Sequence, residues 1–291
     1  MIKKKIGAIL KRFVTNSEWY NKQFLDCDKF WNVDQFGNEV AFIGSDSGHY
    51  ACNWQHKGKK CIDFTLRDST ILQNYEVLRN YSSFLKEKSC SVFMIISPFD
   101  FLTGSTTYFE DRYYTILNMA SIPGFAYERR AEVLMRRNNP ILYYPLFCLK
   151  KDLFAKRNSK YFNKTTAQQY IDHIKQRYGI RDLSLKMSMI NQDSFDDSFL
   201  IISKISSFCI EHGFRFTLVF PPVTKVFADY LHQFTDNEAY INMLNRIKAL
   251  NIKVLDYSFD KDYADNSGFF ISELYLNEKG AERFSNQLLE Q

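Results

Sequence analysis

The chain is short of the residue patterns that hold common cofactors. It has 11 glycines and six prolines among 291 residues, and no Gly-x-Gly-x-x-Gly or phosphate-loop spacing occurs. Such glycine spacing is what brings a backbone close to nucleotide phosphates. The six cysteines are scattered, with no close pair at metal-ligand or redox spacing. We therefore expect no metal and no cofactor, and we expect unpaired core thiols in a reducing cytoplasm.

The sequence also lacks a long apolar run. No stretch reaches the roughly 20 apolar residues that a membrane-spanning helix needs. The N-terminus begins like a signal peptide, but its apolar stretch is short and is closed by Lys11 and Arg12. Residues 2–14 predict an amphipathic helix with lysines opposite an apolar face. We expect a cytoplasmic protein whose helix either packs on the domain or makes peripheral contact with an anionic membrane.

A strong charge of one sign is absent as well. Lys and Arg number 38 against 33 Asp and Glu, giving a net charge of +5. This is far from the footprint of a nucleic-acid-binding protein, although it suits anionic partners such as phosphate. Aromatic residues, in contrast, are plentiful: 27 Phe and 18 Tyr make most of a 16% aromatic share. So many rings need a core, a groove or a glycan to rest on.

Apolar runs of strand length alternate with helical patterns along most of the chain. The runs that predict strands are 39–44, 61–66, 91–99, 215–220 and 253–257. The patterns that predict helices are 69–88 with Ser69 as cap, 194–212 begun by Ser194, 224–250, and a last helix from about Asn277. This alternation predicts an α/β fold of three layers, α/β/α, with a mostly parallel sheet.

Two stretches depart from that rhythm. Residues 1–35 form a basic amphipathic N-terminal segment, and 36–291 form the α/β domain. Within the domain, about 103–193 reads as a helical insertion in which basic and tyrosine residues are frequent. It either lies over the carboxyl edge of the sheet, where open α/β folds bind ligands, or forms a solvated lobe with no ligand role.

Several segments, in order, carry a resemblance to a known family. They are 42–47, 63–66, 95–101, 219–225 and 276–280. Their order and spacing resemble the SGNH (GDSL) hydrolase superfamily, whose domain is flavodoxin-like. More narrowly, they resemble the SGNH-like proteins encoded with bacterial capsule and O-antigen biosynthesis. The resemblance covers most of the chain outside the first 35 residues and the insertion.

The resemblance implies a nucleophile at the first of these segments. The superfamily motif Gly-[Asp/Ser]-Ser matches Gly44 and Ser45 but puts Asp46 at the nucleophile position, with Ser47 one residue further on. A hydroxyl at such a strand-to-helix turn can attack a carbonyl while backbone N–H groups hold the oxyanion. The other interpretation is that Ser45 and Asp46 only cap the next helix.

Other motif positions are altered. The second block has no glycine in residues 66–69, and Phe99 replaces the usual asparagine of the third block, where only Asp100 matches. Residues 272–275 replace the superfamily's Asp-x-x-His, so its base and the carboxylate that orients it are missing. Tyr275 is a poor base at neutral pH. Among the histidines, only His173 of the insertion is a candidate to reach the cleft.

The resemblance leads to two functional hypotheses. The first is an atypical SGNH-type transferase or esterase of surface-polysaccharide biosynthesis, which adds or removes an acyl or related group on a glycan precursor. Its partners would be a glycan or lipid-phosphate-linked sugar and an anionic acyl donor. The second is an inactive SGNH-fold protein that binds glycan or docks partner enzymes. The implied catalytic residues are Ser45, Asp46, Ser47, Asp100 and Tyr275, and the implied substrate-binding residues are Gly44, Asp63, Arg67, Ser272, Glu273 and Asn277.

Overall fold

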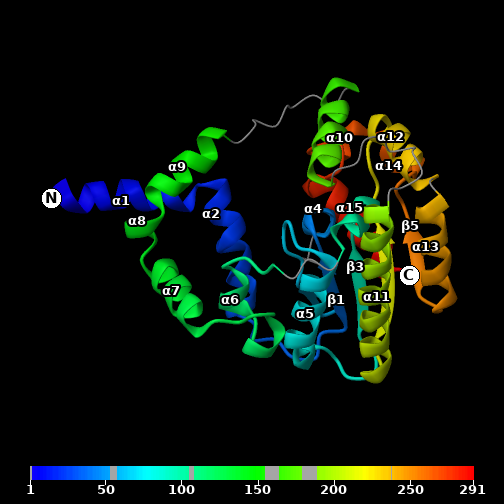
Figure 1. Cartoon of the computed structure of the whole chain (residues 1–291), viewed down its shortest axis with the longest axis horizontal. Helices are drawn as coiled ribbons and strands as arrows, with labels where there is room; N and C mark the ends of the chain where they lie inside the picture. Colours follow the sequence, from blue (N-terminus) through cyan, green and yellow to red (C-terminus); the bar gives the residue numbers. More distant parts are fainter. Residues whose placement is uncertain (1, 53–57, 105–107, 155–163, 179–188, 237) are drawn as a thin grey trace. The chain divides into compact units, whose positions relative to one another are not determined.

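The computed structural model describes the chain except residues 1, 53–57, 105–107, 155–163, 179–188 and 237 (Figure 1). It divides into two compact units, each made of two separate stretches of sequence. The smaller unit comprises Met1–Asp34 and Thr107–Arg157, and the larger unit comprises Gln35–Thr106 and Asn158–Gln291. Each unit is described by itself below.

The larger unit is built on a five-stranded sheet in the order β2-β1-β3-β4-β5. Every neighbouring pair of strands is parallel, so all carboxyl ends lie at one edge of the sheet. The strands are β1 (Val40–Gly44), β2 (Cys61–Asp63), β3 (Ser91–Ile95), β4 (Arg215–Phe220) and β5 (Lys253–Asp256). The α/β fold with a parallel sheet, predicted from the alternation of patterns, is confirmed.

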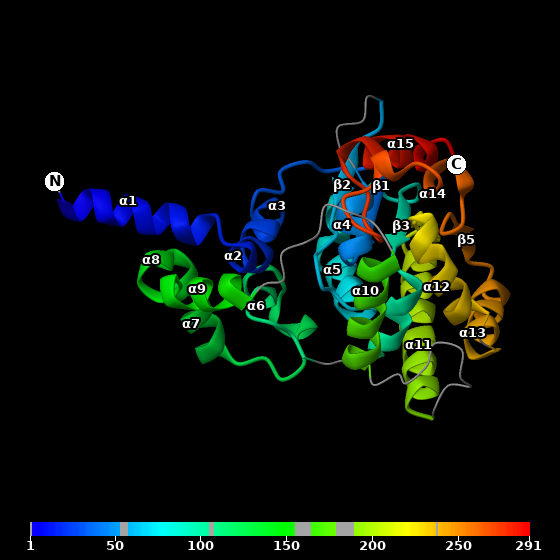
Figure 2. The same cartoon turned by 90° about the horizontal axis from the view of Figure 1, so that it is seen from above.

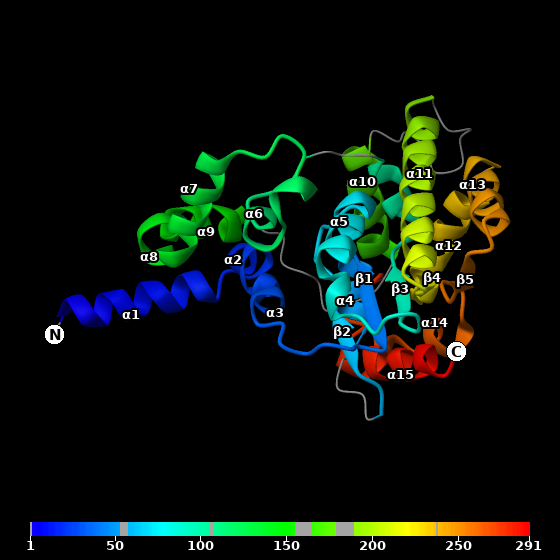
Figure 3. The same ribbon diagram turned by 90° about the horizontal axis from the view of Figure 1, so that it is seen from below.

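Helices cover both faces of this sheet, which gives the predicted three layers. Figures 2 and 3 show α15 on one face and α5 and α11 on the other. On the α15 face, the rings of Phe42 and Phe93 stack with centroids 5.6 Å apart and join Phe284 in a buried cluster. The helices of this unit are α4 (Asp46–Ala51), α5 (Ile71–Tyr81), α10 (Lys164–Tyr178), α11 (Met189–Glu211), α12 (Lys225–Thr235), α13 (Glu238–Ala249), α14 (Lys261–Ala264) and α15 (Glu278–Leu289), with 3-10 turns at η2 (Ser82–Phe84), η3 (Pro98–Thr103) and η5 (Ser267–Phe269).

Some helix boundaries differ from the sequence prediction. Thr70, not Ser69, caps α5: its side chain accepts the N–H of Gln73 while Gln73 accepts the N–H of Thr70. The Ser69 hydroxyl instead donates to the carbonyl of Gly44. Helix α11 begins at Met189, before the expected Ser194. The helical patterns predicted over 224–250 form two helices, α12 and α13.

The smaller unit is helical and is held together by a buried aromatic cluster. Val14, Tyr20 and Phe24 pack with Tyr144 and Cys148. The Phe24 ring lies 5.4 Å from the Tyr144 ring between centroids. Its elements are α1 (Ile2–Thr15), α2 (Glu18–Gln23), η1 (Leu25–Cys27), α3 (Asp28–Trp31), α6 (Tyr113–Ile116), η4 (Met119–Ser121), α7 (Tyr127–Asn138), α8 (Pro140–Tyr143) and α9 (Pro145–Phe154).

This unit joins two parts that the sequence separated. The expected N-terminal segment, 1–35, and the first half of the expected insertion, 103–193, share one core instead of being an arm and a lobe. The second half of the insertion, with α10, belongs to the sheet-containing unit. The two stretches form one unit because aromatic rings from both are buried together. Such a contact between distant parts of the chain cannot be predicted from local sequence patterns.

Two predictions about the whole chain can be compared with the described residues. In those residues we find no helix with the length and apolar character needed to cross a bilayer. None of the six cysteines forms a disulfide, and five of them are buried. Burial raises the pKa of Cys27, Cys90 and Cys209 to about 12, so these thiols stay protonated and inert at neutral pH.

Candidate functional site

The site is built on the tight passage from β1 into α4. Gly44 ends β1 with a φ of +153°, and a Cβ there would lie 2.1 Å from the carbonyl oxygen of Ile95 on the neighbouring strand. The N–H of Gly44 donates to Oδ1 of Asn74 at 3.0 Å, and its carbonyl accepts the Ser69 hydroxyl at 3.0 Å. Gly44 therefore positions the turn, and only glycine fits there.

Ser45 is the first side chain beyond this turn. It occupies the N-cap position of α4 but makes no capping hydrogen bond. Its Oγ instead donates to Oδ2 of Asp100 at 2.6 Å. The same carboxylate oxygen accepts the N–H of Ser97 at 2.9 Å, which fixes Asp100 at the end of β3. The capping interpretation is thus wrong for Ser45, whose hydroxyl joins the ends of two adjacent strands.

The Asp46 side chain contacts the second altered motif, residues 66–69, at Asp68. Asp68 has a φ of +54°, a left-handed conformation that favours glycine. Its N–H donates to Oδ2 of Asp46 at 2.8 Å. The family resemblance implies that a glycine near this position would donate its N–H to an oxyanion. The backbone retains the glycine-like shape, but the Asp46 carboxylate already occupies this donor.

The third altered motif lies in the aromatic core. The Phe99 ring is buried, with its centroid 4.6 Å from that of Phe234, and its N–H donates to Oγ of Ser97. A phenyl ring has no hydrogen-bond donor, so it cannot replace the asparagine amide that the family places here. At the two positions where the resemblance implies oxyanion donors, the Asp68 N–H is therefore occupied by Asp46 and Phe99 offers no side-chain donor.

Tyr275 lies against two other tyrosines. Its hydroxyl shares a hydrogen bond of 2.7 Å with the hydroxyl of Tyr170 on α10, and its ring stacks on Tyr50 with centroids 4.8 Å apart. Burial, and then the neighbouring Tyr170 and Asp46, raise the pKa of Tyr275 well above its usual value. A phenol with a raised pKa stays protonated, so Tyr275 is suited to donating a hydrogen bond and unsuited to acting as a base.

These groups surround one pocket of about 250 Å³ at the carboxyl edge of the sheet. All five residues predicted as catalytic line it. So does His173 of α10, the one histidine expected to reach the cleft. The lining residues are Ser45, Asp46, Ser47, Asp68, Ser97, Phe99, Asp100, Tyr170, His173, Ile174, Leu274 and Tyr275.

The sequence did not indicate the contribution of α10 beyond His173. Tyr170, His173 and Ile174 lie at i, i+3 and i+4 on α10, so they share one face of that helix. Tyr170 also packs edge-on against Phe227 of α12, which secures α10 over the sheet. The i, i+3, i+4 spacing was a detectable signal, but it does not say what that face covers.

The predicted substrate-binding residues lie outside this lining. Asp63 accepts hydrogen bonds from the N–H and the hydroxyl of Thr65, at 2.7 and 2.6 Å. Asn277 caps α15 by accepting the N–H of Gly280, and donates to the carbonyl of Gly268. Gly44 shapes the turn below the pocket. The three others, which also lie outside the lining, are Arg67, Ser272 and Glu273.

Glu273 and Ser272 nevertheless have an unusual environment. Oε1 of Glu273 and Oγ of Ser272 are buried and have no hydrogen-bond partner among the described residues. The carbonyl of Glu273 accepts both the N–H and the hydroxyl of Thr224, which fixes the backbone before α12. Residues 272–275 are therefore held by their backbone and by the Tyr275 hydroxyl, while these two polar atoms have no partner among the described residues.

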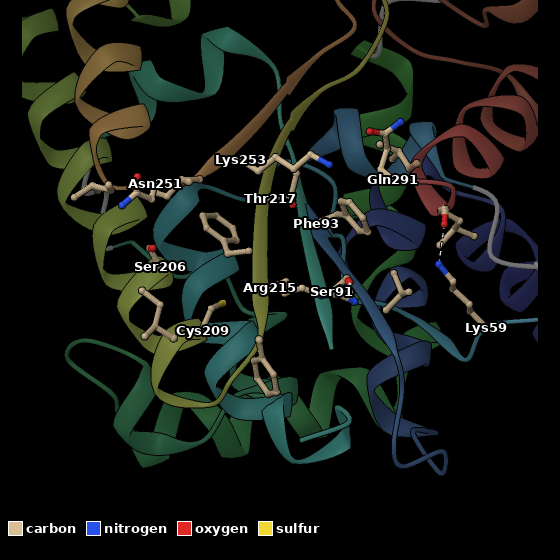
Figure 4. A pocket seen from close by; sticks show the side chains of 18 of the residues that line it. Lys59, Ser91, Phe93, Ser206, Cys209, Arg215, Thr217, Asn251, Lys253 and Gln291 are labelled. Atoms are coloured by element: carbon tan, nitrogen blue, oxygen red, sulfur yellow. Dashed lines mark hydrogen bonds between the residues drawn. The ribbon is translucent and has the colours of Figure 1, made fainter. Parts of the chain in front are cut away.

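A larger pocket, of about 610 Å³, lies at the opposite edge of the sheet (Figure 4). It is lined by the first residues of three strands, Ser91, Arg215 and Lys253, and Arg215 donates to the Ser91 hydroxyl at 3.1 Å. None of the residues predicted as catalytic or substrate-binding lies there. Open parallel sheets bind ligands at the carboxyl edge, so we favour the smaller pocket. The described residues contain no cluster of three His, Cys, Asp or Glu side chains placed to hold an ion.

Comparisons with known proteins do not assign this chain to a family. No family model matches it, and no curated protein matches it. One solved chain is described as "a putative platelet activating factor from Streptococcus pneumonia". The two are 10% identical, with a TM-score of 0.40, over 99% of this chain and 98% of the other. A similarity this weak supports neither a family nor a function.

Proposed function

We propose that this protein is an atypical SGNH-type enzyme of bacterial surface-polysaccharide biosynthesis. It would add an acyl or related group to a glycan precursor, or remove one. The observation that carries the proposal is the Ser45 hydroxyl, which is not spent on capping α4 and donates to Asp100 in a pocket that His173 also lines. A hydroxyl, a carboxylate and an imidazole around one cavity are the groups that acyl transfer uses.

The chemistry can be written with these side chains. Oγ of Ser45 attacks the acyl carbonyl carbon, and its proton passes to the imidazole of His173. The C–O bond to the donor then breaks, and the departing oxygen takes that proton. A sugar hydroxyl or water next attacks the acyl-serine and loses its proton by the same route, which restores Ser45. Asp100 keeps the serine hydroxyl oriented between turnovers, because its own position is fixed by the Ser97 N–H.

Other observations support the alternative, an inactive glycan-binding or partner-docking protein. Asp46 blocks the N–H of Asp68, and Phe99 replaces an amide donor. Three tyrosines, Tyr50, Tyr170 and Tyr275, supply rings and hydroxyls of the kind that bind sugars. Under this alternative the pocket holds a sugar and performs no reaction on it.

The proposed anionic partner has less support than the glycan. Several arginines of the expected insertion are engaged inside the smaller unit: Arg129 pairs with Asp111 and Arg112 with Glu110. Arg112 is fully buried. Guanidinium groups used in this way are not available to hold a phosphate. A glycan or lipid-phosphate-linked sugar therefore remains the proposed substrate class, with the tyrosines as its main contacts.

Labelling with a fluorophosphonate probe tests the proposal, because the probe reacts only with an activated serine. We expect the purified protein to be labelled and Ser45→Ala to abolish labelling. His173→Ala should slow labelling by about a hundredfold or more, the low end of what a general base contributes. The controls Ser206→Ala, at the opposite edge of the sheet, and His232→Ala should label normally.

The same assay separates the two hypotheses. Labelling that survives Ser45→Ala but is lost in Ser47→Ala would move the nucleophile to Ser47. Absence of labelling, together with no hydrolysis of p-nitrophenyl esters, would rule out serine chemistry and favour the glycan-binding alternative. That alternative would then be examined on a glycan array, with Tyr170→Ala as the variant expected to lose binding.

A further inference from the structure

In the smaller unit, large apolar side chains are exposed to solvent on two neighbouring helical segments. Helix α1 packs against α8 and α9. On α1, Ile6, Ile9 and Phe13 are exposed. On α8 and α9, Leu142 and Leu146 are 76% and 82% exposed, and Leu149 is also exposed. These six residues are named the apolar stripe. A soluble surface rarely leaves so many large apolar side chains uncovered within one small unit.

The spacing of the stripe shows that its exposure is built into the helices. Along α8 and α9, Tyr144 and Cys148 are buried in the aromatic cluster while Leu142, Leu146 and Leu149 are exposed. Leu146 and Leu149 are three positions apart on α9 and share a face of that helix, and Leu142 lies on α8 just before it. On α1, Val14 is buried while Ile6, Ile9 and Phe13 recur at the same kind of spacing. Each segment thus has one face for the core and a second apolar face.

Basic residues accompany this second face. Residues 1–16 and 140–154 contain seven Lys and Arg and one acidic residue, Asp152. Lys11, Arg12 and Lys150 are exposed. The bias extends to the unit: 1–34 and 107–157 carry 16 basic and nine acidic residues, a charge of +7, so the rest of this +5 chain carries −2. Positive charge is thus concentrated in the unit that exposes the stripe.

We infer that the apolar stripe is a docking surface for an anionic lipid bilayer, formed jointly by α1, α8 and α9. Apolar side chains beside lysines and arginines suit the boundary between acyl chains and anionic headgroups. Tyr143 and Phe147, both exposed in the same segment, are of the aromatic type enriched at that boundary. A second copy of the chain is a poorer occupant, because a two-fold interface would bring the same positive charges together. The inference is independent of the chemistry in the pocket.

Sedimentation with sucrose-loaded vesicles tests this with the full chain. We expect binding to vesicles of equal parts phosphatidylglycerol and phosphatidylcholine, and much weaker binding to phosphatidylcholine alone. Leu142→Ser with Leu146→Ser should lower the partition coefficient by at least about tenfold. Lys11→Glu with Arg12→Glu should lower it by a similar factor on the anionic vesicles only. These side chains are exposed, so the variants should retain the wild-type circular dichroism.

Matched controls come from the larger unit. Leu200→Ser with Ile210→Ser removes two exposed apolar side chains of α11, and Lys204→Glu with Lys248→Glu reverses two exposed charges. Both controls should bind vesicles like the wild type. A fluorophore on Leu146→Cys should also shift to the blue with vesicles, while the wild type, whose cysteines are mostly buried, provides the labelling background.

Three results would overturn the inference. The first is that the wild type binds neither vesicle, and the second is that the stripe variants bind as well as the controls. The third is concentration-dependent self-association of the wild type that the stripe variants abolish, with no vesicle binding. That result would assign the stripe to a second copy of the chain.

Discussion

At the scale of single residues, the chemistry of the site depends on which acceptor each hydrogen-bond donor already binds. Ser45 donates to Asp100, and the N–H of Asp68 is held by Asp46. Polar residues that were predicted to be catalytic therefore already form hydrogen bonds within the site. Activity would require substrate to replace the Asp46 carboxylate at the Asp68 N–H, or to find its oxyanion donors elsewhere.

Tyr275 gives a pH-dependent prediction at this scale. Tyr275→Phe removes the hydrogen bond to Tyr170 and should lower the free energy of unfolding by about 1 kcal/mol at neutral pH. The raised pKa of Tyr275 means that the unfolded chain ionises first, so the wild type loses stability as pH rises past about 10. Tyr275→Phe has no phenol to ionise and lacks that loss. The deficit, meaning the amount by which its free energy of unfolding falls below that of the wild type, should therefore shrink at high pH.

Urea unfolding at neutral pH and at about pH 11 measures both quantities. Tyr127→Phe, at an exposed position in the smaller unit, is the control and should show no change in deficit between the two pH values. A deficit for Tyr275→Phe that stays constant with pH would contradict the assignment of a protonated, buried phenol.

At the scale of elements, the sequence was most informative where local chemistry decides the structure. β4 matches its prediction at both ends, because Pro221 stops the strand and Arg215 follows the glycine turn at Gly213. The expected strands at 61–66 and 91–99 are shorter in the structure, ending at Asp63 and Ile95. Both are followed by local hydrogen bonds that turn the chain: Asp63 accepts from the Thr65 hydroxyl, and Ser97 accepts the N–H of Phe99.

The candidate site was predictable to the same extent. Residues next to strand ends, such as Ser45 and Asp100, could be grouped because parallel strands end at one edge of a sheet. Tyr170 could not, because its partner Tyr275 lies 105 positions away and only packing brings α10 over that edge. Asn277 was predicted to bind substrate, but capping α15 accounts for its hydrogen bonds without a ligand.

The capping role of Asn277 yields a prediction. Asn277→Ala loses the hydrogen bonds to Gly280 and Gly268 and should cost about 1–2 kcal/mol of stability. Fluorophosphonate labelling at Ser45 should stay normal in the folded protein, because the side chain lies outside the pocket lining. Thermal unfolding and labelling are measured together, with the exposed Asn245→Ala of α13 as control. Lost labelling with unchanged stability would restore Asn277 to the site.

At the scale of the whole molecule, the division into two units is the feature that the sequence concealed most. Each stretch of the smaller unit is too polar, or too short, to suggest a core by itself. Their aromatic cluster forms only when residues from both stretches combine: Tyr20 and Phe24 from one, Tyr144 and Cys148 from the other. Composition pointed to an excess of rings without showing where they gather.

Phe24→Ala tests the independence of the two units. The ring contacts Trp19, Tyr20 and Tyr144, so its loss should destabilise the smaller unit by about 3–5 kcal/mol. Hydrogen exchange followed by mass spectrometry should then rise across α1, α2, α7 and α9 but stay unchanged in β1 and β3. Phe284→Ala, in the core on the α15 face of the sheet, should give the converse pattern. Uniform acceleration in both variants would mean that the chain unfolds as one unit.

The two-stretch construction of the smaller unit also has a consequence during synthesis. Helix α1 leaves the ribosome long before α8 and α9, against which it packs. At ordinary translation rates the delay is on the order of ten seconds. Throughout that interval the nascent chain presents an amphipathic basic helix without α8 and α9 to pack against. A membrane surface or a chaperone can therefore meet α1 before its own fold does, and the order of those encounters would decide where the finished protein resides.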